Sequence, residues 1–359
     1  MAVAKGAVVG RIGTRRRPLR ASGAALLAAL ALAATACGGG TKGAGSVTLR
    51  LGYFPNMTHA PAIIGVEKGF FKDELGSNVT IDAKTFNAGP DVVTAIFSGA
   101  LDISYIGPNP AINAWSQSKG KAIHVIAGST SGGAALVTKP GITIAAQLKG
   151  KTIATPQLGN TQDVALRWWL KTQGFATTQE GGGDVKVKPQ SNSQTIDTFG
   201  AGQIDGAWVP EPFWSRLEVE SGAKVLVNEA SFWPGGRFVT THIIVRTEFL
   251  NAHRDIVEKF LRGHVKAVDF ANANPAEAQT VVNTALEKRT GKGLKAETIK
   301  AAWGHLQFTV DPIASSLRDS AKHAEEVGLL DRVDLTGIYD LDPLNKVLGD
   351  LGKSTVSAT

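Results

Sequence analysis

The sequence predicts an α/β protein built as two lobes, each around a largely parallel sheet. Three observations lead to this fold class. From Val47 onward, short apolar runs alternate with longer segments whose apolar residues have helical spacing. The alternation is interrupted by a glycine- and proline-containing stretch at residues 128–149 and restarts at Lys151. The 359 residues are also enough for two lobes of roughly 100–200 residues each.

The first series of predicted elements begins at Val47. Its strands are apolar runs, or runs in which apolar and polar residues alternate as in a strand with one buried face. They cover residues 47–53, 79–86, 101–106 and 123–127. The helical patterns between them cover residues 60–71, 90–98 and 110–119, and the first ends near Gly69.

The second series repeats this plan after the interruption. Gly132-Gly133, an apolar run at 134–137 and Pro140-Gly141 together indicate a domain boundary. The strands that follow cover residues 151–155, 185–189, 206–209 and 224–228, and the helices cover 161–173, 194–201 and 212–221. After a strand-like run at 238–246, helical patterns dominate, at 253–273, 275–288, 295–306 and 313–327.

One local pattern occurs in both series. Residues 101–110 and 204–212 each contain an aliphatic residue, an aspartate, an aromatic residue three positions later and a Pro-x-Pro. Asp102 and Asp205 hold the equivalent positions. The repetition indicates one strand-to-loop design used once in each lobe, with generic α/β turn chemistry as the alternative.

The net charge of +7 belongs almost entirely to the N-terminal segment. Residues 1–36 contain six basic and no acidic side chains, whereas residues 37–359 contain 32 basic and 31 acidic ones. A nucleic-acid-binding protein needs its basic surface on the folded domain. We therefore expect no nucleic-acid partner.

Residues 1–36 have the pattern of an export signal. The basic stretch at 11–20 precedes an uncharged run at 21–36, which is shorter than the roughly 20 residues of a membrane-spanning helix. The small residues before Cys37, the only cysteine, resemble a bacterial lipobox, although Ala34 stands where leucine is usual. This resemblance implies lipidation of Cys37 and anchoring to the cell membrane, with the glycine-rich residues 37–46 as a flexible tether. A secretory signal with an incidental cysteine is the alternative, and the twin-arginine route also stays open.

The predicted ligand site consists of four strand-to-helix loops, at residues 54–60, 106–111, 155–163 and 209–213. Ligands of open α/β sheets bind at the carboxyl ends of strands, where helix N-termini point. These loops and the boundary stretch offer neutral polar groups: Asn56, His59, Asn109, Ser129, Thr130, Asn160, Thr161 and Gln162. Glu211 is the expected partner for a ligand amine, and Trp208 for an apolar ligand part. Helix capping, turn chemistry and core packing are the alternatives for these residues.

Catalytic and metal-binding patterns do not appear in the sequence. The seven histidines lack metal-ligand spacing, and there is no nucleophile elbow, phosphate-binding loop or dinucleotide fingerprint. We therefore expect a protein without enzymatic activity, cofactor or metal.

Several segments together resemble the ABC-transporter solute-binding proteins of the aliphatic sulfonate, taurine and nitrate type. The resemblance extends over about residues 48–270. It rests on Leu51-Gly52-Tyr53-Phe54-Pro55, His59-Ala60, Val66-Glu67-Lys68-Gly69-Phe70-Phe71, Phe86-Asn87-Ala88-Gly89-Pro90, Gly107-Pro108-Asn109-Pro110-Ala111, Leu148-Lys149-Gly150-Lys151 and Trp208-Val209-Pro210-Glu211-Pro212.

This resemblance implies a two-lobed periplasmic-binding-protein type II fold with a ligand cleft between the lobes. The first lobe would comprise residues 47–136 and the second 140–237. Residues 238–359 would hold the return crossover and the C-terminal helices of the first lobe. The crossovers would lie near 134–139 and 239–245.

The resemblance also implies a function. The protein would capture a small anionic organic solute outside the cytoplasm, above all an aliphatic sulfonate or taurine, and deliver it as a monomer to its cognate permease. Nitrate, bicarbonate or a thiamine-pyrimidine precursor are alternative ligands. A pyrimidine synthase of the same fold is a further alternative, but the cysteine-rich motif expected of that enzyme is missing.

Overall fold

The computed structural model describes residues 46–358, which belong to one compact unit. The predicted export signal, the predicted lipidation site Cys37 and most of the predicted tether lie outside the described residues. In the described part of the chain, no helix is both long and apolar enough to cross a membrane.

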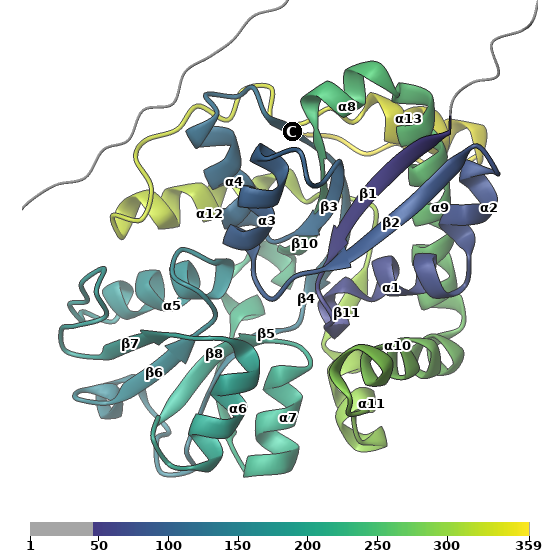
Figure 1. The fold of residues 1–359 in the computed structure, drawn as a ribbon. Helices are drawn as coiled ribbons and strands as arrows, with labels where there is room; N and C mark the ends of the chain where they lie inside the picture. The colour runs from purple at the N-terminus through teal and green to yellow at the C-terminus, as the bar shows by residue number, and fades with distance from the viewer. Residues whose placement is uncertain (1–45, 359) are drawn as a thin grey trace, which may run out of the picture. The chain divides into compact units, whose positions relative to one another are not determined.

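Two separate sheets organise the described residues (Figure 1). The first has the strand order β11-β4-β10-β3-β1-β2. Its strands are β1 (Val47–Tyr53), β2 (Val79–Thr85), β3 (Ile103–Ile106), β4 (Ile123–Gly132), β10 (Val239–Arg246) and β11 (Leu306–Phe308). The second has the order β7-β6-β8-β5-β9. It contains β5 (Ala134–Thr138), β6 (Thr152–Thr155), β7 (Lys186–Pro189), β8 (Gly206–Pro210) and β9 (Lys224–Asn228).

Both sheets are mixed: the strands of each predicted series run in one direction, as expected, but β5, β10 and β11 run in the opposite direction. β1 pairs in parallel with β2 and β3, and β6 with β7 and β8. β10 is antiparallel to β3 and β4, and β5 is antiparallel to β8 and β9. The reason is the route of the chain. A strand that enters a sheet from the other sheet starts at the edge where the parallel strands end, so it runs in the opposite direction.

Helices cover both faces of each sheet. One face of the first sheet packs against α1 (Ala60–Glu67), α2 (Phe70–Leu75), α9 (Arg254–Ala273), α10 (Pro275–Thr290) and α13 (Asp342–Asp350). The other face packs against α3 (Gly89–Phe97), α4 (Pro108–Gln117) and α12 (Ala314–Glu326). The second sheet lies between α5 (Thr161–Thr172) on one side and α6 (Asn192–Gly200) and α7 (Phe213–Ser221) on the other. We call each sheet with its helices a lobe.

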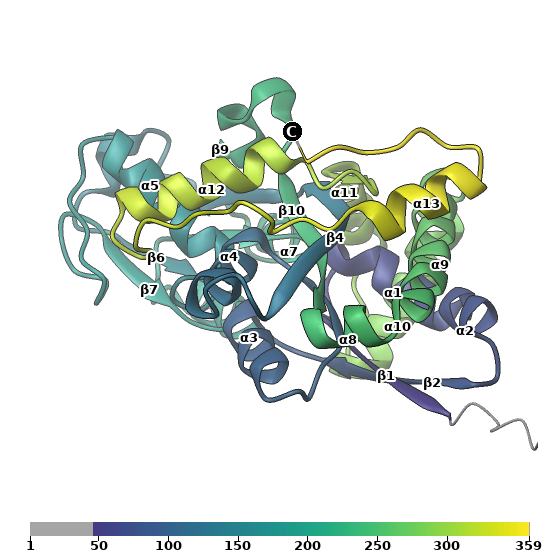
Figure 2. The same cartoon turned by 90° about the horizontal axis from the view of Figure 1, so that it is seen from above.

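The predicted elements are confirmed with few changes. The expected helix at 60–71 is two helices, because Gly69 adopts a left-handed conformation (φ 77°) between α1 and α2. Neither α8 (Thr247–Ala252), α13 nor β11 was predicted. Figure 2 shows α12 lying between α4 of the first lobe and α5 of the second, and it contacts both helices.

The chain passes between the sheets at two places, through Gly132-Gly133 and through the 3-10 turns Glu229–Phe232 and Pro234–Gly236. The crossover strands expected near 134–139 and 239–245 correspond to β5 and β10, which follow the two passages. Both glycines have positive φ, 78° and 71°. A Cβ atom on Gly132 would lie 2.6 Å from the carbonyl oxygen of His305, so space as well as conformation requires glycine there.

The repeated sequence pattern has one structural role in both lobes. The backbone N–H of Asp102 donates to the carbonyl of Arg50 (2.9 Å), and the Asp102 carboxylate accepts from the Arg50 N–H (3.0 Å). Asp205 makes the same two contacts with Thr152, at 2.8 and 3.0 Å. Each aspartate thus joins the start of β3 or β8 to the parallel strand beside it.

Candidate functional site

A small cavity of about 20 Å³ lies between the two lobes, and we call it the inner pocket. Its walls follow the carboxyl ends of parallel strands in both sheets, as the loop argument predicted. The first lobe contributes Phe54, Asn56, Thr58, His59, Asn87, Gly107, Thr240 and Thr241, and the second contributes Pro156, Asn160, Thr161, Gln162, Asn192 and Pro210. None of these residues is acidic, lysine or arginine.

The second-lobe wall of the inner pocket is the N-terminus of α5. Asn160 caps this helix, and its Oδ1 accepts from the backbone N–H of Thr161 at 3.0 Å. A helix N-terminus carries partial positive charge and unpaired backbone N–H groups. The Oγ1 atoms of Thr161 and Thr241 are buried and have no hydrogen-bond partner among the described residues. Leaving a buried polar group unpaired costs about 1–3 kcal/mol, which a bound polar ligand would offset.

Asn56 and Asn160 each use their side-chain oxygen in a hydrogen bond within the protein. The Oδ1 of Asn56 accepts from Thr58 Oγ1 at 2.7 Å, and the Oδ1 of Asn160 is occupied by the Thr161 N–H. The amide NH₂ group of each side chain is a donor only. Asn56 and Asn160 therefore keep both of their side-chain N–H donors, and one lone pair of each Oδ1, for a ligand.

His59 offers a third donor without carrying charge. Burial lowers the pKa of its imidazole to about 3, so the ring is neutral at pH 7. Its Nδ1 accepts from the backbone N–H of Phe54 at 3.2 Å. In a neutral ring with Nδ1 as acceptor, the proton is on Nε2.

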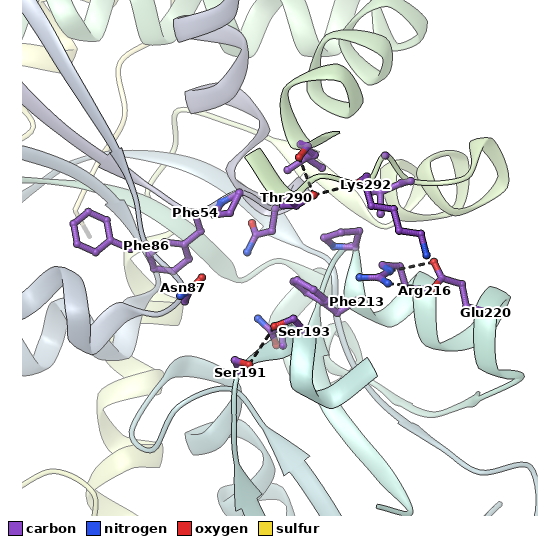
Figure 3. Close-up of a pocket in the computed structure, with 17 residues that line it drawn as sticks. Phe54, Phe86, Asn87, Ser191, Ser193, Phe213, Arg216, Glu220, Thr290 and Lys292 are labelled. Carbon is purple, nitrogen blue, oxygen red and sulfur yellow. Dashed lines mark hydrogen bonds and ion pairs between the residues drawn. The ribbon is translucent and has the colours of Figure 1, made fainter. Parts of the chain in front are cut away.

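A larger cavity of about 380 Å³, which we call the outer groove, adjoins the inner pocket (Figure 3). Both cavities share Phe54, Asn56, Asn87 and Asn192. The outer groove is also lined by the β2–α3 loop, by the start of α6, by α7 and by the end of α10 with the segment that follows it. Its apolar lining residues are Phe54, Pro55, Phe86, Pro212, Phe213, Leu286 and Leu294, and its charged ones are Arg216, Glu220 and Lys292.

Half of the predicted site residues line the inner pocket. These residues are Asn56, His59, Asn160, Thr161 and Gln162. They come from two of the four predicted loops, one in each lobe. The other two predicted loops reach the cavities through Gly107, Pro210, Pro212 and Phe213 instead.

The other predicted residues line neither cavity. Asn109 donates from Nδ2 to the carbonyl of Ser320 (3.1 Å), and Thr130 donates to the carbonyl of Thr58 (2.7 Å). Ser129 is fully buried and its Oγ has no partner among the described residues. Trp208 lies in the core of the second lobe, where its Nε1 donates to Glu229 Oε2 at 2.7 Å.

Glu211 is the residue whose position differs most from the expectation of an amine partner. Its buried carboxylate accepts from the backbone N–H and the Oγ of Ser215, at 3.1 and 2.8 Å. It also lies 2.6 Å from Nδ1 of His305, whose ring stacks on Trp214 at 3.7 Å. Burial raises the pKa of Glu211, while the hydrogen bonds from His305 and Ser215 act in the opposite direction. The carboxylate is fully engaged within the protein and does not face a ligand cavity.

Several lining residues were not predicted as site residues. Asn87 and Asn192 each follow a predicted strand, so the rule applied to the four loops could have found them. Thr240 and Thr241 lie inside β10, where nothing in the local sequence distinguishes them from other strand residues. Among residues 46–358, no group of three or more acidic, histidine or cysteine side chains could hold a metal ion.

The comparisons with known proteins agree with this geometry. The chain is 28% identical over 279 residues to a Brucella abortus (strain 2308) protein named only as a candidate binding protein, covering 71% of this chain and 84% of that protein. It is 29% identical over 215 residues to the taurine-binding periplasmic protein of Escherichia coli (strain K12), covering 60% of this chain and 64% of that protein.

A solved structure confirms the two-lobed periplasmic-binding-protein type II fold with a cleft between the lobes. It is the alkanesulfonate-binding protein SsuA from Xanthomonas axonopodis pv. citri, which superposes with a TM-score of 0.69 at 18% identity, covering 83% of this chain and 99% of that one. The profile described as the NMT1-like family matches residues 42–286. The protein is therefore a member of the NMT1-like family.

Proposed function

We propose that this protein is the extracytoplasmic solute-binding component of an ABC importer and that it captures a small organic sulfonate between its two lobes. The observation that carries the proposal is the set of donors in the inner pocket. Asn56, His59 and Asn160 present N–H groups, the α5 N-terminus adds partial positive charge, and no charged side chain lines the pocket. Such a site suits an anion that only accepts hydrogen bonds.

A sulfonate fits these requirements well. It stays ionised without a counter-charge, and its three oxygens can accept from several donors at once. The unpaired hydroxyls of Thr161 and Thr241 can also donate to it. The taurine- and alkanesulfonate-binding proteins among the similar proteins support the same ligand class.

The other ligands predicted from the sequence have less support. Taurine carries an ammonium group, and Glu211, its expected partner, is occupied by Ser215 and His305. Nitrate and bicarbonate would fill the inner pocket but leave the outer groove without a contact. A thiamine-pyrimidine precursor would bring ring nitrogens that accept and an amine that donates, whereas the identified groups of Asn56, His59 and Asn160 are donors.

We also propose a role without enzymatic turnover. The similar proteins with a stated role are named as binding proteins. The proposal includes export through residues 1–36, lipidation of Cys37 and anchoring to the cell membrane. It also includes delivery of the solute to a cognate permease by a monomeric protein. The proposal keeps the expected lobe boundaries 47–136, 140–237 and 238–359, except that β5 belongs to the second lobe because it pairs with β8 and β9.

The proposal is tested by thermal denaturation of the purified chain with ethanesulfonate, taurine, nitrate and bicarbonate. Ligand that binds only the native state raises its stability as RT ln(1 + [L]/Kd). We expect concentration-dependent stabilisation by ethanesulfonate and unchanged ligand in the recovered sample by mass spectrometry. Stabilisation by nitrate or bicarbonate alone would contradict the sulfonate assignment, and conversion of the ligand would contradict the binding role.

A further inference from the structure

We infer that the sulfonate carries a bulky apolar group, such as an aryl or cyclic alkyl group, and that the outer groove binds it. This inference rests on the proposed function and extends it from the head group to the rest of the solute. It distinguishes the ligand of this protein from two-carbon sulfonates such as taurine.

The first argument is the continuity of the two cavities. Phe54, Asn56, Asn87 and Asn192 line both, so a molecule anchored in the inner pocket extends directly into the outer groove. The inner pocket, at about 20 Å³, has room only for a compact head group. The outer groove, at about 380 Å³, lies within the size range of small-molecule sites.

The second argument is the chemistry of the groove walls. Phe54 and Leu286 are almost completely buried, and the half-buried Phe86, Phe213 and Leu294 add apolar surface. These side chains come from loops of the first lobe, from the start of α7 in the second lobe, and from α10 with the segment that follows it. An apolar ligand group that displaces water from such walls is stabilised in proportion to the apolar area it buries.

The third argument concerns the charges in the groove. The guanidinium of Arg216 forms two contacts with the Glu220 carboxylate, both 3.1 Å, which leaves this pair without net charge (Figure 3). Lys292 also interacts electrostatically with Glu220, and these contacts lower the pKa of that carboxyl group. The guanidinium of Arg216 is therefore directed to a protein carboxylate, and Lys292 leaves the groove with one net positive charge.

The fourth argument is that the C-terminal wall of the groove is fixed by hydrogen bonds. The side-chain amide of Asn283 accepts from the backbone N–H of Leu294 (2.8 Å) and donates to its carbonyl (3.2 Å). Thr290 Oγ1 donates to the carbonyl of Lys292 at 3.0 Å. A wall held in this way can select ligands by shape, because it costs energy to move aside.

The test compares sulfonates that share a head group and differ in the attached group. Isothermal titration of the full chain would use methanesulfonate, ethanesulfonate, taurine, 2-phenylethanesulfonate and 3-carboxypropanesulfonate. We expect 2-phenylethanesulfonate to bind at least about tenfold more tightly than ethanesulfonate. The inference would be overturned if 2-phenylethanesulfonate and ethanesulfonate bound with equal affinity, or if taurine or 3-carboxypropanesulfonate bound more tightly than 2-phenylethanesulfonate. Each of these results would leave the proposed function intact. Failure of every sulfonate to bind would overturn both.

Two variants test the groove itself. Leu294→Ala removes apolar wall, and Ser193→Phe fills the groove from α6; neither residue lines the inner pocket. Each should weaken 2-phenylethanesulfonate binding by about fivefold or more and leave methanesulfonate within about twofold. Leu351→Ala, at an exposed leucine outside both cavities, is the matched control. Equal losses for both ligands, or no loss for the larger one, would contradict the assignment of the groove.

Discussion

Gly107 of the first lobe lies directly against Thr161 of the second, at the wall of the inner pocket. A Cβ atom on Gly107 would come within 2.4 Å of Thr161 Oγ1 and 3.6 Å of the Thr240 carbonyl. The backbone of Gly107 is ordinary, with φ −73°. Space rather than conformation therefore requires glycine here, and a single methyl group would disturb the contact between the lobes.

Gly107→Ala is expected to weaken sulfonate binding by about tenfold, because the added methyl displaces the Thr161 hydroxyl from the pocket. The unliganded protein should lose little stability, since the lobes can separate slightly. Isothermal titration and thermal denaturation measure the two effects. Gly141→Ala is the control, since its new Cβ would have open space and its φ is not positive. Wild-type affinity in Gly107→Ala would show that this contact does not matter for binding.

Thr161→Ala is expected to weaken sulfonate binding by about 1–3 kcal/mol through loss of a buried donor. The same change should leave the unliganded protein as stable as the wild type or more so, because the hydroxyl has no partner among the described residues. Thr161→Ser should restore binding. Thr280→Ala, on the exposed face of α10, is the matched control.

Asn160→Ala is expected to lower both the stability of the protein and its affinity for sulfonate. The cap of α5 disappears, which costs about 1 kcal/mol of stability, and the donor to the ligand disappears with it. Both denaturation and titration should show the change. Unaltered affinity in both Asn160→Ala and Thr161→Ala would exclude the start of α5 as a ligand contact.

Glu211→Ala tests whether this carboxylate holds a ligand amine. It should destabilise the protein by about 2–4 kcal/mol, because the bonds from Ser215 and His305 are lost in a buried place. The ratio of taurine to ethanesulfonate affinity should stay the same. Urea denaturation and paired titrations supply the two quantities, and a selective loss of taurine binding would restore Glu211 as the amine partner.

Glu229 should give the protein a distinctive pH dependence. Burial raises the pKa of its carboxyl group to about 7, although the Trp208 indole donates to it. The native state therefore keeps a proton that the unfolded state releases near pH 4.5. The free energy of unfolding should fall as pH rises from about 4.5 to 7, by ~3 kcal/mol from this group.

The variant Glu229→Gln cannot release this proton. Its free energy of unfolding, relative to the wild type, should rise over the same pH window. Contributions from the buried histidines, whose pKa values are lowered, are common to both proteins and cancel in the difference. Urea denaturation at several pH values measures this difference, with the exposed Glu297→Gln as control. A constant difference between pH 4.5 and 7 would contradict the prediction.

The sequence predicted those parts of the fold that depend on local patterns. Apolar periodicity placed nearly all strands and helices, and the Asp102 and Asp205 patterns correspond to equivalent strand contacts. Sheet direction was predicted less well, because it depends on where the chain crosses between lobes rather than on the composition of a strand. β11 consists of three residues, too few for a periodic pattern.

The site residues, too, were predicted where local sequence patterns determine their position. Asn56, His59 and Thr161 were found because each lies in a loop or helix start that follows a strand. Glu211 also follows a strand, but its partner His305 lies 94 positions away in the sequence. No local pattern predicts which distant residue will occupy a buried carboxylate.

The residues that line the inner pocket lie as far apart in the sequence as Phe54 and Thr241. During synthesis, none of the earlier segments can assemble the complete pocket until the ribosome has also produced β10. A prematurely terminated chain that ends before Thr241 thus lacks part of the recognition surface.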